Sequence, residues 1–366
     1  QARAGVFGGR PAPAGKAVEE TAVRSVFLFT DGLANEGVTE SGRLVAMLRK
    51  MLDRSPRVRV FTFGFGSDHS PSMLSALAEA GSGTYYYIEN EEKIPTAFAD
   101  ALGGLLSVAV QNVSVEFAPG PGVTVSEVHT SFATAPAPGG GRAVTVGDLF
   151  SEESKDILFD VELPALPAPA DRFLVGTLKV SFLDVASASN RTEEVACYVA
   201  RPDEVAAADA EPSMGVTLQR ARVATARTLL EAREEADADR FDAARARIGG
   251  SLGWLREVQS RAEGAGEGGE MARNFVEDLE EALSNMEDRG TYRSHGTKVM
   301  SGKGMGHMQQ RSCALEQDDF DEVDDGGVEE EAGCKQAARR SKFSYANQNQ
   351  RAMRKSAKTW FSPGSA

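Results

Sequence analysis

The stretch that decides the fold is Ser25–Asn35, SVFLFTDGLAN. Five consecutive residues, Val26 to Thr30, are apolar or β-branched, and the run ends abruptly at Asp31-Gly32. Such a short apolar run is typical of a strand buried on both faces of a parallel sheet. Because open α/β sheets bind ligands at the carboxyl ends of their strands, Asp31 is the first candidate site residue. The Asp-Gly pair alone indicates only a turn.

An alternation of helices and strands continues downstream of this first strand. The predicted elements are a helix over Thr39–Leu52, a strand over Val58–Phe65, a short helix capped by Ser70, a strand over Thr84–Ile88 and a helix over Glu91–Val108. Strands that alternate with helices through short links imply a parallel sheet with right-handed crossovers. Residues 22–110 are therefore expected to form a partial, doubly wound α/β sheet.

Three strands make a thin sheet, and the first of them has no upstream partner in the pattern. A buried strand without a neighbour would leave backbone groups unpaired at an edge. The pattern is thus typical of the second half of a larger domain. Residues 1–21 begin at Gln1 rather than methionine, contain Gly8-Gly9, Pro11 and Pro13, and show no period. We expect them to be a loop or junction, and the sequence to be a fragment.

Several spaced motifs agree in their order along this region. They are FTDGLANEG at residues 29–37, RVFTFGFG at 59–66 and AGSGTYYYI at 80–88, followed by the amphipathic closing helix. Together they resemble the second half of a von Willebrand factor A domain, over roughly residues 22–110. In that family a metal-ion-dependent adhesion site draws on a DxSxS motif, a Thr and an Asp in a strand-TDG turn. The resemblance implies that Asp31 matches this last Asp.

The first half of that metal site has no counterpart upstream of Asp31. Only thirty residues precede Asp31, and no DxSxS occurs among them. A carboxylate is a suitable ligand for Mg²⁺ or Mn²⁺, but a single one does not hold such an ion. We therefore expect Asp31 to be a metal ligand only in the complete domain, and we expect no cofactor for these 366 residues alone.

The sequence period changes to two between residues 111 and 200. Six alternating segments, separated in part by Gly and Pro clusters, are NVSVEFA, VTVSEV, AVTVGDL, ILFDVEL, FLVGTLKVSF and EVACYVA. Short strands at this spacing predict an antiparallel β-sandwich. The acids Asp148, Asp156 and Asp160 are expected to lie in turns or on the solvent face.

A linker over residues 201–212 leads into a helical region at 213–311. Helices are predicted over Met214–Arg240, Phe241–Ala262 and Glu270–Met286, with Trp254 packed between them. The region resembles the Vwaint segment, which accompanies A domains in eukaryotic proteins, some of them ubiquitin ligases or Hint-domain proteins. His295 and His307 lie in a Gly/Met-rich part expected to be flexible. Without further His or Cys at ligand spacing, a metal role for them is not expected.

The tail over residues 312–366 changes charge along its length. Ten acids fall within the sixteen residues Glu316–Glu331, and eight Lys or Arg within Lys335–Lys358. Blocks of like charge predict solvated disorder. The alternative is that the basic segment docks on a partner or on the acidic segment.

Composition narrows the class of protein. The chain has 366 residues, 41% of them hydrophobic and 26% charged, with a formal net charge of −14, which argues against a general nucleic-acid binder. The three cysteines, Cys197, Cys313 and Cys334, are too few and too scattered for a disulfide framework, which favours an intracellular, cytoplasmic protein. The longest apolar stretch, Ala101–Val110, is too short to span a membrane.

Three functional hypotheses remain open. The sequence contains no nucleophile–His–acid set, P-loop or zinc cluster, so we assign no catalytic residue and expect no enzyme activity. The first hypothesis is a non-enzymatic protein-interaction module, metal-dependent in its full-length form, with an unidentified protein partner. The second is the substrate-binding portion of a ubiquitin ligase whose RING or U-box lies upstream. The third is a degenerate fragment without metal binding.

Overall fold

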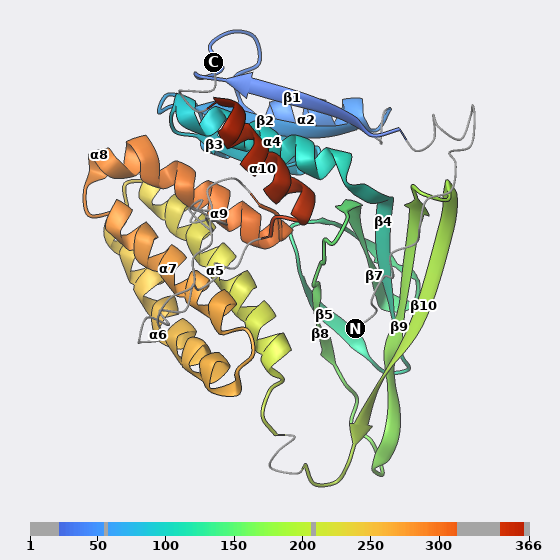
Figure 1. Cartoon of the computed structure of the whole chain (residues 1–366). Coiled ribbons are helices and arrows are strands. Elements are labelled where there is room, and N and C mark those ends of the chain that lie inside the picture. The colour runs from blue at the N-terminus through green and yellow to red at the C-terminus, as the bar shows by residue number, and fades with distance from the viewer. Residues whose placement is uncertain (1–21, 55–57, 206–209, 313–344, 362–366) are drawn as a thin grey trace, which may run out of the picture.

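The computed structural model describes residues 22–54, 58–205, 210–312 and 345–361, with the side chains of 358–361 left out. Three units pack against one another (Figure 1): an α/β unit, a β-sandwich and a group of helices. The predicted mixed α/β class is thus the class that the structure has. The predicted junction at 1–21 and the acidic block of the tail lie outside the described residues.

The α/β unit contains three parallel strands in the order β1-β2-β3: β1 (Arg24–Thr30), β2 (Val58–Phe65) and β3 (Tyr85–Ile88). Helices α2 (Ser41–Leu52) and α3 (Pro71–Ala80) cover one face. Helix α4 (Ile94–Leu106), preceded by the single turn η1 (Glu91–Lys93), covers the other. Both faces of β2 and β3 are buried, which explains why these strands are apolar without alternation.

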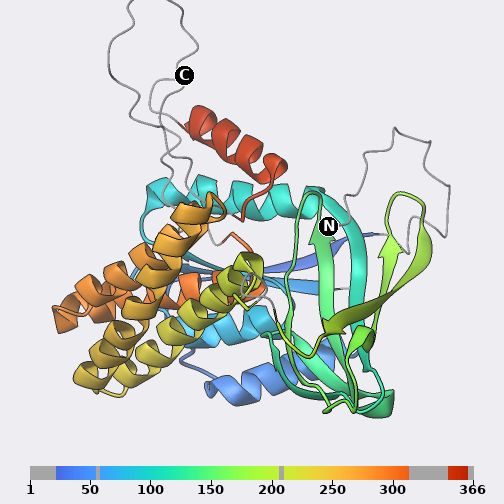
Figure 2. The ribbon, with the colours of Figure 1, turned by 90° about the horizontal axis from the view of Figure 1, so that it is seen from below.

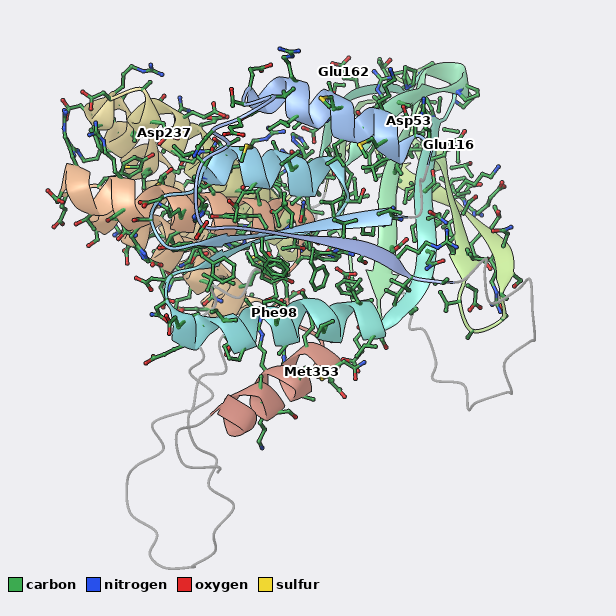
Figure 3. All side chains as sticks on the ribbon, turned by 90° about the horizontal axis from the view of Figure 1, so that it is seen from above. Asp53, Phe98, Glu116, Glu162, Asp237 and Met353 are labelled. Carbon is green, nitrogen blue, oxygen red and sulfur yellow. The ribbon has the colours of Figure 1, made fainter. Side chains whose placement is uncertain are left out.

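Aromatic rings fill the space between the sheet and α4. Phe63, which is fully buried, stacks on Tyr86 at 5.0 Å and on Phe98 at 5.3 Å between ring centroids. Phe98 projects from α4 toward the sheet (Figure 3), where it also stacks on Phe29 at 5.0 Å. These contacts hold β1 against the sheet from one side only.

Strand β1 is an edge strand in the described part of the chain. It pairs with β2 alone, in a parallel register from Arg24 opposite Val58 to Thr30 opposite Gly64. The side chains of Val26 and Phe29 are 49% and 41% exposed, although both belong to the apolar run expected to be buried. The expected unpaired edge is therefore present, and β1 is not the central strand of this sheet.

The sandwich begins directly after α4. Its larger sheet has the order β10-β9-β4-β7-β6, and β5 pairs with β8 in a second, two-stranded sheet. The bounds are β4 (Val108–Pro119), β5 (Thr124–His129), β6 (Ala133–Ala137), β7 (Gly141–Phe150), β8 (Leu158–Glu162), β9 (Ala170–Asp184) and β10 (Ser189–Arg201), with a short turn η2 (Pro138–Gly140). The six predicted alternating segments all lie in strands, and the alanine-rich β6 is an addition.

The helical unit has three long helices and a buried fourth. They are α5 (Met214–Asp237), α6 (Phe241–Ala265), α7 (Gly269–Asn285) and α9 (Thr297–Gln309), with α8 (Arg289–Thr291) and the π-helical η3 (Tyr292–Gly296) before α9. The prediction for Trp254 is wrong, because it is 40% exposed. The inward stripe of α6 runs through Ile248, Leu252 and Leu255, and Trp254 lies off that stripe.

The Gly/Met-rich segment expected to be flexible forms helix α9, and that expectation is wrong. Helix α9 lies between α5 and the α/β unit. Its glycines allow this close packing, since a Cβ at Gly304 would come within 2.9 Å of the Leu230 side chain. His307 is 6% exposed and lies 2.6 Å from Asp278 and 3.1 Å from the Tyr345 hydroxyl. It therefore ties α9 both to α7 and to the residues before α10.

Helix α10 (Gln348–Phe361) corrects the expectation that the whole 312–366 tail is disordered. It runs along α4 in both views (Figures 1 and 2), and Met353 marks it beneath α4 in Figure 3. Asn347 and Gln350 cap it reciprocally, each side chain accepting from the other's backbone N–H. Gly103 lets the helices touch, because a Cβ there would lie 2.8 Å from the Cα of Gln350.

A buried ion pair anchors α10. Arg354 donates from Nε to Asp100 Oδ1 at 2.9 Å, and its Nη2 lies 2.6 Å from the same oxygen. Tyr86 donates to the other Asp100 oxygen at 3.0 Å, and Asp100 is fully buried. Charge-assisted bonds of this kind fix a helix that local charge pattern alone predicts to be disordered.

We predict that Arg354→Ala destabilises the protein by about 3–5 kcal/mol, because it leaves the buried Asp100 carboxylate without its cation. Urea unfolding followed by circular dichroism measures this change. The matched control is Arg351→Ala on the exposed side of α10, which should cost less than about 0.5 kcal/mol. Equal stabilities of the two variants would show that the Arg354–Asp100 pair does not hold α10.

Candidate functional site

Asp31 lies where the sequence places it, in the turn at the carboxyl end of β1. Its side chain is exposed. The Thr30 hydroxyl donates to the Gly32 carbonyl at 3.0 Å and accepts from the Gly32 N–H at 3.3 Å. The turn is thus closed by local bonds, and the neighbouring hydroxyl is engaged within it.

The described residues do not fit a metal centre at Asp31. A hard divalent cation takes about six oxygen ligands. Within the described ranges, the one set of three His, Cys, Asp or Glu side chains that converge closely enough for an ion is Glu127, His129 and Asp160, in the sandwich. Asp31 contributes to no such set. We therefore derive no chemistry through a metal ion at this turn.

The turn after β2 is covered by the helical unit. His69 is 4% exposed, and its ring nitrogens lie 3.2 Å from the Phe65 carbonyl and 2.7 Å from the Tyr85 hydroxyl. Burial lowers the pKa of His69, which favours the neutral ring. Lys298, at the start of α9, is 1% exposed and donates to two η3 carbonyls. In the sequence, only the Ser-Asp-His run after β2 gives a signal at this place. By itself that run indicates the start of a helix and not the packing of the helical unit.

The cluster Glu127–His129–Asp160 is neutralised by helix α5. Arg227 donates to Glu127 at 2.7 Å, and Arg220 donates to Asp160 at 2.5 Å. The bond from Arg227 lowers the pKa of Glu127, and the bond to His129 lowers that of Asp160. Two guanidinium groups beside the carboxylates disfavour a bound cation. The cluster instead joins the β5–β8 sheet to the helical unit.

The acids expected in turns or on the solvent face have different environments. Asp148 is 6% exposed and makes two bonds to Arg59 of β2, at 2.6 and 3.1 Å, so the surface expectation for it is wrong. The backbone carbonyl of Asp156 accepts from Arg222 and Gln310. These contacts join units that are remote in sequence, which the local pattern around each acid does not reveal.

Exposed apolar side chains gather on the β1 side of the α/β unit. Every residue of α2 is at least partly exposed, and α2 packs chiefly on α3 rather than over β1. This leaves apolar side chains of β1, of the turn after it and of α2 between 38% and 66% exposed, which together we call the β1–α2 surface: Val26, Leu28, Phe29, Leu33, Met47 and Met51. Grouped apolar exposure beside an unpaired strand edge is a feature of protein-interaction sites.

The architecture of the α/β unit is that of a von Willebrand factor A-like fold, and comparisons with known proteins agree. Residues 12–87 match the family model of the von Willebrand factor type A domain. A von Willebrand factor type A structure from Catenulispora acidiphila superposes with a TM-score of 0.58 at 16% identity, covering 78% of this chain and 66% of that one. That likeness concerns the fold alone. Domains of this family mediate protein interactions.

Two curated proteins share segments with the chain. Von Willebrand factor A domain-containing protein 5A of mouse is 29% identical over 100 residues, which is 27% of this chain. The E3 ubiquitin-protein ligase WAV3 of Arabidopsis thaliana is 26% identical over 185 residues, which is 43% of this chain. The matches span 12% and 25% of the lengths of these relatives. Among the helices that the structure describes, none is long and apolar enough to cross a membrane.

We predict that millimolar Mg²⁺ leaves the melting temperature of this chain unchanged. A ligand that binds only the native state raises its stability, and within the described residues Asp31 belongs to no set of three converging His, Cys, Asp or Glu side chains. Differential scanning fluorimetry with and without Mg²⁺ or Mn²⁺ measures the effect, with Asp31→Ala beside the exposed control Asp203→Ala. A rise of several degrees that only Asp31→Ala abolishes would contradict this interpretation of the turn.

Proposed function

We propose that the chain acts as a non-enzymatic protein-interaction module and that its β1–α2 surface meets the partner. The observation that carries the proposal is the combination of an unpaired strand edge and apolar side chains in a von Willebrand factor A-like unit, within the described residues. A partner strand that pairs with β1 would satisfy its outward backbone groups. Burying each apolar side chain of this surface would add about 1–3 kcal/mol.

We propose metal dependence only for a form of the protein in which further residues supply the other metal ligands. In such a form Asp31 would contribute one carboxylate to Mg²⁺ or Mn²⁺. The resemblance of the strand-TDG turn to the family's motif supports this assignment. The side chains near Asp31 do not support it, because within the described residues Asp31 belongs to no set of converging ligand side chains. The interaction proposed for the β1–α2 surface does not require the ion.

A second candidate is the substrate-binding portion of a ubiquitin ligase. It is favoured by the 185-residue match to the ligase WAV3, which covers 43% of this chain but 25% of that protein. Helices α5–α9 would then be the Vwaint-like part that accompanies the α/β unit. In this case the partner on the β1–α2 surface would be a substrate for ubiquitin transfer.

Site-specific photocross-linking tests the proposed surface. A photoreactive residue at Leu33 or Met47 should capture a discrete partner in an extract of the source cells, and Val26→Lys with Leu28→Lys should abolish the capture. The matched control places the same group at Val195, which is 62% exposed on β10.

Three outcomes of this experiment are informative. Equal capture at Val195 would contradict the assignment of the surface. Capture at none of the positions would favour a degenerate fragment and overturn the proposed function. Ubiquitin conjugates on the captured partner would favour the ligase alternative.

A further inference from the structure

A pocket of about 500 Å³, with both polar and apolar lining residues, lies where the three units meet. Its walls come from the end of α2, the turn between α3 and β3, the start of β6, the middle of β7 and the residues that end α9. A volume of this size is in the range of ligand pockets. Ser82, which lines the pocket, has a left-handed backbone angle, with φ of 51°. Conformations of this kind concentrate at functional sites.

Two buried acceptors in the pocket wall lack partners within the described structure. Gln309 is 6% exposed, and its side-chain Oε1 makes no hydrogen bond. The hydroxyl oxygen of Ser131 is likewise buried without a partner. Leaving a buried polar atom unsatisfied costs about 1–3 kcal/mol, so these atoms favour a ligand that brings hydrogen-bond donors.

Among the charged lining residues, Arg49, Glu79 and Arg311, the Glu79 carboxylate is the candidate partner for a donor. Arg311 is already used, because it donates to Glu153, to the Asp148 carbonyl at 2.6 Å and to the Ser82 carbonyl at 3.5 Å. The Glu79 carboxylate makes no hydrogen bond or ion pair with another residue in the described ranges. Burial raises its pKa, and the nearby Arg49 opposes that rise. Arg49 itself is exposed on the last turn of α2.

The rim of the pocket leads onto a free strand edge. Within the described residues, β6 is the last strand of the larger sheet and pairs only with β7. Ala133 and Thr134 of β6 also line the pocket. Pro136 lacks an N–H, so the pairing edge is confined to the residues beside the pocket. A short extended peptide that pairs with this edge would lie beside the residues that line the pocket.

We propose that this pocket binds an arginine side chain carried on an extended peptide of a partner protein. A guanidinium offers five N–H donors in a planar fork, enough for Gln309 Oε1, Ser131 Oγ and the Glu79 carboxylate together. The formal charge of −14 would also steer a basic peptide toward the protein. This site is separate from the β1–α2 surface, so either proposal stands without the other.

Titration calorimetry with three blocked tripeptides tests the proposal on the full chain. The probes are acetyl-Ala-Arg-Ala-amide, its neutral isostere with citrulline, and the same peptide with Glu. We expect the Arg peptide to bind and the citrulline peptide to bind at least about tenfold more weakly, since hydrogen bonds to charged groups are the stronger ones. We also expect Glu79→Gln and Gln309→Leu each to weaken binding of the Arg peptide by about tenfold or more.

The control variant is Glu267→Gln, an exposed acid in the turn between α6 and α7, which should leave binding unchanged. Because Gln309 is buried and its variant could misfold, Glu79→Gln at the partly exposed wall serves as the second, independent variant. Equal binding of the Arg and citrulline peptides would overturn the proposal, as would unaltered binding in the Glu79→Gln variant. Preference for the Glu peptide would instead identify an anion site on Arg49, and absence of binding by the Arg peptide would also contradict the proposal.

Discussion

Arg311 is the side chain on which the three units converge. It follows helix α9, and it donates to Glu153 and to the Asp148 carbonyl of the sandwich and to the Ser82 carbonyl of the α/β unit. Burial opposes ionisation of Glu153, but Arg311 and Lys155 outweigh it and lower its pKa to about 2. Lys155 in turn donates to the carbonyls of Gln309 and Gln310. Since a buried charge is tolerated only when paired, each of these groups requires the other units in place.

The contacts of Arg311 with the three units explain which surfaces of the molecule are closed and which stay open. The interior faces of β2 and β3 are closed by α3, α4 and α9, and α10 closes the outer side of α4 through Arg354 and Asp100. The β1 edge and α2 stay outside this closed body, with their apolar side chains exposed. An open strand edge with exposed apolar side chains beside it suits a protein that presents a surface to a partner.

Periodicity predicted the regular elements well. The apolar run at Val26–Thr30 and the alternation after residue 111 indicated the α/β sheet and the sandwich, because these patterns reflect burial on one or two faces. Long-range pairing was not predictable from local pattern. Helix α10 depends on Asp100, which lies 254 residues from Arg354, and Asp148 depends on Arg59, 89 residues away. Likewise, α9 is held by close packing of glycines rather than by an apolar stripe.

The candidate sites likewise divide into features that a local motif predicts and features that only long-range packing creates. Asp31 and its turn could be located from a single strand-TDG motif, whereas the pocket brings together residues from at least five elements whose spacing in sequence carries no signal. The β1–α2 surface was predicted in part, because an apolar strand without a neighbour implies an exposed edge. Its extension onto Met47 and Met51 follows from the packing of α2 on α3, which only the structure shows.

Scanning calorimetry of the Arg311→Met variant tests most directly whether Arg311 couples the three units. Methionine keeps the unbranched stem of the side chain but removes the charge and every bond to Glu153, Asp148 and Ser82. If Arg311 couples the units, the unaltered protein melts in one cooperative transition, and the variant melts in two or more, the first at a lower temperature. A variant that melts in one transition at an unchanged temperature would contradict that role of Arg311.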